Sequence, residues 1–213
     1  MSGSALRVPD YGVASLADVG PSLLSALGVV GEPNTLQLPE LQRACLFVVD
    51  GLGWTQLQAN ADAAPFLTSM SARSLTAGFP ATTVTSLASL GTGLPPGEHG
   101  LTGYSSYVSE VDAVVNWLAW RSVGEGADLR DRLVPEVVQP RPTVWERAQA
   151  AGLATTICTY DHFADTGLTR AVLRGGRWGG TLAEGDAVAR AAAAADRGHR
   201  SLVYVYVSAL DLV

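Results

Sequence analysis

The sequence contains no lysine: all 14 of its basic residues are arginines, against 20 acidic residues and a formal net charge of −6. Without lysine, no Gly-x-x-x-x-Gly-Lys-Ser/Thr segment can occur, which excludes a P-loop nucleotide site. The acidic balance and the scattered arginines also argue against nucleic acid as a partner, because binding to its phosphates needs clustered cations.

Cysteine and long apolar stretches are scarce as well. Cys45 and Cys158 lie in apolar runs without the spacing of a metal or redox motif, so we expect two buried free thiols. No apolar stretch is long enough to span a bilayer, and the N-terminus lacks the pattern of a signal peptide. We therefore expect a cytoplasmic chain with no membrane partner, and nothing in the sequence indicates its oligomeric state.

What the sequence does contain is apolar runs that alternate with helix-type segments. At 47% hydrophobic and 16% charged residues, the composition is that of a folded chain. After a proline-punctuated lead-in over residues 1–40, this alternation predicts an α/β fold, a mainly parallel sheet with helices on both faces. We expect strands over 44–49, 75–79, 153–160 and 201–207, helices over 83–90, 143–151 and 182–195, and a hairpin or edge excursion over 104–120.

Polar residues follow three of the expected strands: Asp50, the pair Thr82 and Thr83, and Asp211. Functional groups of open parallel sheets gather beyond the carboxyl ends of the strands. Thr83 would also stand at a helix start, where unpaired amides favour an anion such as phosphate. Each residue alone has an ordinary explanation as a turn aspartate or a capping threonine. Together, two carboxylates and a hydroxyl suit a divalent cation that activates an alkoxide.

Three segments carry a resemblance to a known family: LFVVDGLGW (46–54), FPATTVTSLASLGTGLPPGEHGLTGY (79–104) and VYVSALD (205–211). They resemble the type I phosphodiesterase/nucleotide pyrophosphatase family of the alkaline phosphatase superfamily. The resemblance implies a metal-dependent hydrolase of small-molecule phosphate esters or nucleotides, with a threonine nucleophile between two zinc ions (Zn²⁺). It also implies that residues 41–213 form the N-terminal part of an alkaline-phosphatase-like catalytic domain.

The same resemblance assigns roles to individual residues. Asp50 matches an aspartate that ligates one zinc, and Asp211 matches a later zinc ligand. The family's nucleophile stands nine residues before the threonine of a Thr-Gly-Leu segment; Thr92 is that threonine here, so Thr83 takes the role and also contacts the metal. The family's next histidine ligand would fall at position 215, so we expect the chain to be an N-terminal fragment of a longer protein, which on its own binds metal weakly and has little or no turnover.

Two further residues are candidates for substrate binding. Tyr104 stands where the family carries an asparagine that holds phosphoryl oxygens, and Trp54 follows the Asp50 turn closely enough to line the cleft. The aromatic residue that often follows the nucleophile is replaced by Val84, which weakens the nucleotide interpretation. Of the histidines, His99 is expected to have a structural role, whereas His162 faces either the cleft or the surface.

Other functions stay open at this level. A catalytically incomplete binding or scaffolding module is one alternative, since the chain holds only part of a two-zinc ligand set. A phosphomonoesterase or phosphonate hydrolase of the same superfamily is another. A sulfatase is disfavoured, because no Cys-x-Pro-x-Arg segment occurs to supply its nucleophile.

Overall fold

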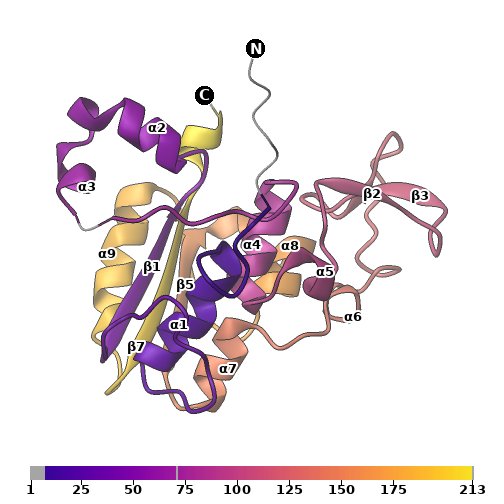
Figure 1. The fold of residues 1–213 in the computed structure, drawn as a ribbon. Coiled ribbons are helices and arrows are strands. Elements are labelled where there is room, and N and C mark those ends of the chain that lie inside the picture. The colour runs from indigo at the N-terminus through magenta and orange to yellow at the C-terminus, as the bar shows by residue number, and fades with distance from the viewer. Residues whose placement is uncertain (1–7, 71, 213) are drawn as a thin grey trace.

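The computed structural model describes residues 8–70 and 72–212. A parallel sheet of four strands runs through its centre (Figure 1), in the order β1-β7-β5-β6. The two middle strands, β5 and β7, are buried on both faces, as the inner strands of a parallel sheet require. The strands are β1 (Arg43–Val49), β5 (Ala154–Tyr160), β6 (Arg177–Thr181) and β7 (Ser201–Val207).

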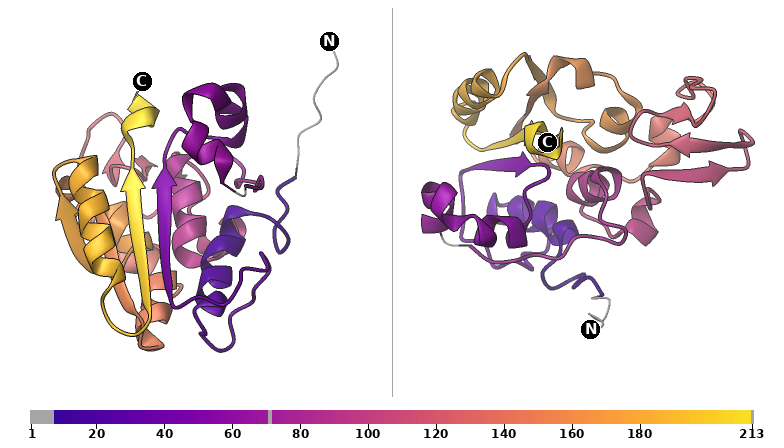
Figure 2. Two further views of the ribbon diagram at one scale, coloured as in Figure 1. Left: turned by 90° about the vertical axis from the view of Figure 1, so that its left-hand side faces the viewer. Right: turned by 90° about the horizontal axis from the view of Figure 1, so that it is seen from above.

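Helices cover both faces of this sheet (Figures 1 and 2). On one face, Ala187, Ala191 and Ala194 form a stripe that packs α9 closely against Cys158 and Val205. The opposite face is covered by four helices and holds the larger core, in which Trp145 and Tyr204 meet edge to face at 5.2 Å. The expected α/β fold with helices on both faces is thus confirmed. The helices are α9 (Glu184–Ala195) on the first face, and α1 (Val19–Ala26), α4 (Thr83–Thr92), α7 (Val144–Ala150) and α8 (Gly167–Val172) on the second.

A small antiparallel sheet projects from the side of the molecule (Figure 1), in the order β2-β3-β4. It confirms the expected hairpin over 104–120. Its strands are β2 (Ser105–Val108), β3 (Ala113–Asn116) and β4 (Arg121–Ser122). The short helical elements that connect the larger ones are η1 (Leu16–Asp18), α2 (Trp54–Ala59), η2 (Ala61–Ala63), α3 (Pro65–Ser69), α5 (Pro96–His99), α6 (Pro135–Val138), η3 (Asp161–Phe163) and η4 (Ala209–Leu212).

The strand expected over 75–79 is wrong. Thr76 makes only an isolated parallel bridge to Ser15, through bonds from Leu16 N to Thr76 O (3.0 Å) and from Thr76 N to Ala14 O (2.8 Å). Phe79 is 71% exposed, so this segment lacks the two buried faces of an inner strand. Conversely, β6 and α8 were not expected, because the two glycines of Arg177–Thr181 and the brevity of Gly167–Val172 conceal them.

The expectation of two buried thiols is correct for Cys158 and wrong for Cys45. Cys45 pairs in register with Val203, and both face the layer of α9. That helix packs mainly on β5 and β7, so the same face of β1 stays open at Cys45 and Phe47. In the described part of the chain, no helix combines the length and the apolar character that a membrane span requires.

Candidate active site

The carboxyl ends of β1 and β7 bring the two predicted aspartates together. The strands are hydrogen-bonded neighbours, and the Asp50 N–H donates to the Val207 carbonyl at 2.9 Å. The next residue, Gly51, has a φ of +77°, and a Cβ there would lie 2.8 Å from the Asp211 nitrogen. Only glycine tolerates both the left-handed backbone and this close approach. The turn after β1 therefore packs directly against the segment that carries Asp211.

Thr83 is presented to these aspartates by the start of α4. Thr82 is the N-cap, and its hydroxyl accepts the Thr85 N–H at 3.3 Å. Thr83 is therefore the first helical residue, and its Oγ1 donates to Asp50 Oδ2 at 3.2 Å. The alternative of Thr83 as the capping residue is wrong. The first amides of a helix lack intrahelical acceptors, so the Thr83 hydroxyl lies where an anion is favoured.

Sequence reasoning missed a third partner of Asp50. The Tyr206 hydroxyl donates to the same Oδ2 atom at 2.6 Å, while Asp50 Oδ1 accepts the Gly51 N–H at 3.0 Å. Burial, and then the bond to Asp50, raise the pKa of Tyr206 above its usual value, so its hydroxyl stays a donor. The alternation of VYVYV in β7 is the signal that places Tyr204 and Tyr206 on one face.

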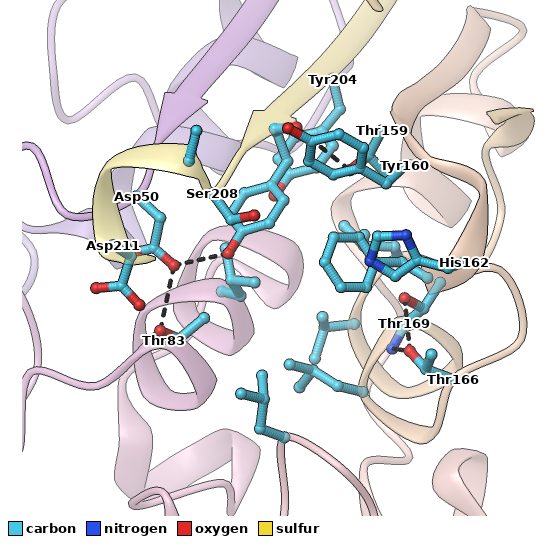
Figure 3. Close-up of a pocket in the computed structure, with 18 of the residues that line it drawn as sticks. Asp50, Thr83, Thr159, Tyr160, His162, Thr166, Thr169, Tyr204, Ser208 and Asp211 are labelled. Carbon is cyan, nitrogen blue, oxygen red and sulfur yellow. Dashed lines mark hydrogen bonds between the residues drawn. The ribbon is translucent and has the colours of Figure 1, made fainter. Parts of the chain in front are cut away.

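These residues line one end of a cavity of about 680 Å³ (Figure 3). The Asp50 and Asp211 carboxylates and the Thr83 hydroxyl gather at one edge of the cavity, and His162 lies on the opposite side. That opposite side is a cluster of rings: His162 stacks on Tyr160 with centroids 5.5 Å apart and lies 4.2 Å from Phe163. His162 lines the cavity and is also exposed, so the two alternatives for it, the cleft and the surface, both apply.

The structure places the two predicted substrate-binding residues outside this cavity. Tyr104 directly precedes β2 and is 46% exposed. Trp54 is the first residue of α2 and lines a separate pocket with Pro9 and Ser74. Neither side chain is among the described residues that line the cavity, so contact with substrate stays a prediction for both.

His99 has the structural role expected from the sequence. Its Nδ1 accepts the Leu101 N–H at 3.1 Å, and its Nε2 lies 3.2 Å from the Ser89 hydroxyl on α4. With Nδ1 accepting, the neutral ring carries its proton on Nε2 and donates it to Ser89. Burial lowers the pKa of His99 to about 4, so the ring is neutral at pH 7. His99 therefore stabilises the position of α4 through Ser89, and it does not line the cavity.

The donor set decides what kind of metal the site fits. Within residues 8–70 and 72–212, no three side chains of histidine, cysteine, aspartate or glutamate cluster with the geometry of a metal site. Asp50, Asp211 and Thr83 supply carboxylate and hydroxyl oxygens at one edge of the cavity, and hard divalent cations prefer such donors. These residues fit one divalent cation as part of its ligand shell, and zinc would add nitrogen donors to them.

Comparison with protein families agrees with this geometry. The model of the family described as type I phosphodiesterase / nucleotide pyrophosphatase matches residues 44–211, most of the chain. No curated protein and no solved structure matches this chain. The matched span contains Asp50, Thr83, Tyr206 and Asp211. The chain therefore belongs to the type I phosphodiesterase/nucleotide pyrophosphatase family of the alkaline phosphatase superfamily, a family of phosphate ester hydrolases.

Proposed function

We propose that this chain is a metal-dependent hydrolase of phosphate esters in which Thr83 is the nucleophile. The observation that carries the proposal is the hydrogen bond from Thr83 Oγ1 to Asp50 Oδ2 at 3.2 Å, made at the first residue of a helix that borders a cavity. A hydroxyl with a carboxylate acceptor at a helix N-terminus combines an oriented nucleophile with a favourable site for phosphoryl oxygens.

Each residue of the site has its own proposed role. Asp50, Thr83 and Asp211 would hold the metal, which we propose to be zinc, with two ions in a complete site. When bound, the metal lowers the pKa of the hydroxyl and neutralises charge on the phosphate. Asp50 orients Oγ1 of Thr83, Tyr206 fixes the Asp50 carboxylate, and the amides at the start of α4 stabilise the equatorial oxygens.

The reaction proceeds in two displacements. Thr83 Oγ1 gives up its proton and forms a bond to phosphorus as the P–O bond of the ester breaks in line, and the leaving alkoxide takes up one proton in exchange, so that an alcohol is released. Water then attacks the phospho-threonine, releases phosphate or a phosphomonoester, and returns the proton to Thr83. We further propose that Tyr104 donates a hydrogen bond to the substrate and that Trp54 contacts a part of the substrate that extends outside the cavity. The division into residues 1–40 and 41–213 and the cytoplasmic location stay predictions.

The test compares the hydrolysis of bis(p-nitrophenyl) phosphate and of p-nitrophenyl phosphate by the purified full-length protein with zinc. Thr83→Ala is expected to lower kcat by at least about a thousandfold, because it removes the atom that attacks phosphorus. Thr82→Ala is the matched control: it removes the helix cap, costs about 1 kcal/mol of stability and leaves turnover largely intact. Wild-type turnover by Thr83→Ala would contradict the proposal.

The same assay separates the alternative functions. Preference for the diester supports the phosphodiesterase, and preference for the monoester supports a phosphomonoesterase of the same superfamily. Zinc binding by the wild-type full-length protein without turnover of either substrate would indicate a binding module.

A further inference from the structure

The cavity next to Thr83 is far larger than a phosphate group, and most of its lining surface is apolar. At about 680 Å³ it is in the size range of pockets that enclose small organic ligands. Leu87 stands one helical turn after Thr83 on α4, so the apolar lining begins directly beside the nucleophile. The apolar residues that continue it toward α8 are Leu118, Phe163, Leu168, Val172 and Leu173.

Most polar side chains around this hydrocarbon are already hydrogen-bonded within the protein. The Thr159 hydroxyl donates to the Tyr206 carbonyl at 3.2 Å, and the Thr166 hydroxyl donates to the Thr169 hydroxyl at 3.0 Å. The Tyr160 hydroxyl donates to Glu184. Sugar hydroxyls and base edges need free partners, so these side chains offer little to a nucleoside.

Tyr204 differs from these residues in having a buried hydroxyl without a partner among the described residues. Within the described chain, the buried side-chain atoms without a hydrogen-bond partner are the hydroxyls of Tyr204 and Thr181, and only Tyr204 lines the cavity. Its ring stacks, with centroids 6.4 Å apart, on Tyr206, the residue whose hydroxyl donates to Asp50.

The charges of the lining exclude a second phosphate. Asp50, Glu184 and Asp211 are acidic, and none of the described residues that line the cavity is an arginine. The chain has no lysine to take that place. Away from the metal that Asp50 and Asp211 would hold, an additional phosphate would meet the Glu184 carboxylate and no arginine, which is electrostatically unfavourable beside largely apolar surface.

We propose that this cavity holds the organic group of the phosphate ester, and that this group is hydrophobic, an alkyl chain or an aryl ring without a second phosphate. The inference rests on the proposed function, which places phosphorus at Thr83. It makes Leu87, Leu118 and Leu168 specificity-determining residues, and it narrows the substrate to the ester of a hydrophobic alcohol in preference to a nucleoside diphosphate.

Calorimetric titration in zinc-containing buffer tests this without relying on turnover. Methylphosphonate, hexylphosphonate and adenosine monophosphate are each titrated into the wild-type chain, with titrations into zinc buffer as reference. Each buried methylene is expected to tighten binding roughly threefold to fourfold, so hexylphosphonate should bind at least tenfold tighter than methylphosphonate. Adenosine monophosphate should bind at least about tenfold more weakly than hexylphosphonate, because its polar atoms find few free partners.

Leu118→Arg is the informative variant. Leu118 lines the cavity yet is 38% exposed, so the longer side chain can be accommodated while its charge enters the apolar space. The hexyl-to-methyl ratio should fall below about threefold. Leu182→Arg is the matched control, since Leu182 is 91% exposed, lies outside the cavity and changes the net charge equally. It should keep the wild-type ratio.

The outcomes separate this inference from the proposed function. Equal binding of the two alkylphosphonates, tighter binding of adenosine monophosphate, or an unchanged ratio in Leu118→Arg overturns the hydrophobic subsite even where Thr83-dependent hydrolysis is observed. The expected ratios without any hydrolysis would overturn the proposed function and support the hydrophobic cavity.

Discussion

The two sides of the cavity arise from the same sheet edge and yet differ in chemistry. At the ends of β1 and β7, three hydrogen bonds converge on the Asp50 carboxylate. At the end of β5, Tyr160, His162 and Phe163 pack ring against ring. We call these the carboxylate side and the aromatic side. Their difference teaches that a parallel sheet supplies a place for a site, whereas the side chains that follow each strand decide its chemistry.

The largest expected effect comes from neutralising the carboxylate side. Asp50→Asn keeps the shape of the side chain but removes the charge that a metal requires, so kcat/KM should fall at least about a thousandfold, or about 4 kcal/mol. Zinc affinity, measured by calorimetry, should fall with it. Asp112→Asn is the control, because Asp112 also accepts a tyrosine hydroxyl, that of Tyr107, on the exposed hairpin. Equal effects of the two variants would show that the carboxylate side has no special role.

The buried His99, which hydrogen-bonds to Ser89 on α4, should affect how the free energy of unfolding depends on pH. Burial lowers the pKa of His99 to about 4 from its ordinary value of 6.5. Between these values the unfolded chain binds a proton that the folded chain does not, so the free energy of unfolding decreases as the pH falls from 6.5 to 4. The loss should total about 3 kcal/mol, and this contribution is constant above pH 6.5.

Urea unfolding of His99→Gln at several pH values measures that contribution. The variant should be less stable at pH 7 but should lose less stability than the wild type on acidification. His199→Gln is the control, because His199 is exposed. Identical pH profiles for His99→Gln and the wild type would mean that this ring does not contribute.

A smaller effect is expected from the hydroxyl that holds Asp50. Tyr206→Phe removes the 2.6 Å hydrogen bond and leaves the ring, so the carboxylate loses one of its orienting donors. Outer partners of metal ligands typically contribute tenfold or more to affinity, so zinc binding should weaken roughly tenfold. Tyr107→Phe, which removes the hydroxyl that donates to Asp112, should leave zinc affinity unchanged. The same affinity in both variants would refute the role of Tyr206.

The smallest effect should come from Tyr204, whose buried hydroxyl has no partner in the described chain. Tyr204→Phe removes a donor that gains nothing in the folded state, so stability should stay the same or rise by about 1 kcal/mol. Thermal unfolding compares it with Tyr206→Phe, which loses a bonded hydroxyl and should be less stable. A large loss in Tyr204→Phe would show that the hydroxyl is hydrogen-bonded after all.

Much of the fold follows from local patterns in the chain. The apolar run of β7 predicts a central parallel strand, and Pro142 and Gly152 mark the two ends of the helix that contains α7. The run at residues 44–49 also predicts a central strand, but β1 lies at the edge of the sheet. The failures also have physical causes. Residues 75–79 are apolar enough for a strand, but their backbone bonds only to residues 14–16 and joins no sheet. Strand β6 forms despite its two glycines because its backbone pairs with β5 in the parallel sheet.

The sequence by itself determined the α/β class, the family resemblance and the candidates Asp50, Thr83 and Asp211, because each depends on spacing along the chain. Only the tertiary structure decided that Thr82 caps α4 and leaves the Thr83 hydroxyl for Asp50, that Tyr206 donates to the same carboxylate, and that the space beside them is apolar. These facts depend on contacts between residues as many as 156 positions apart, and no local pattern encodes the distance between two strand ends.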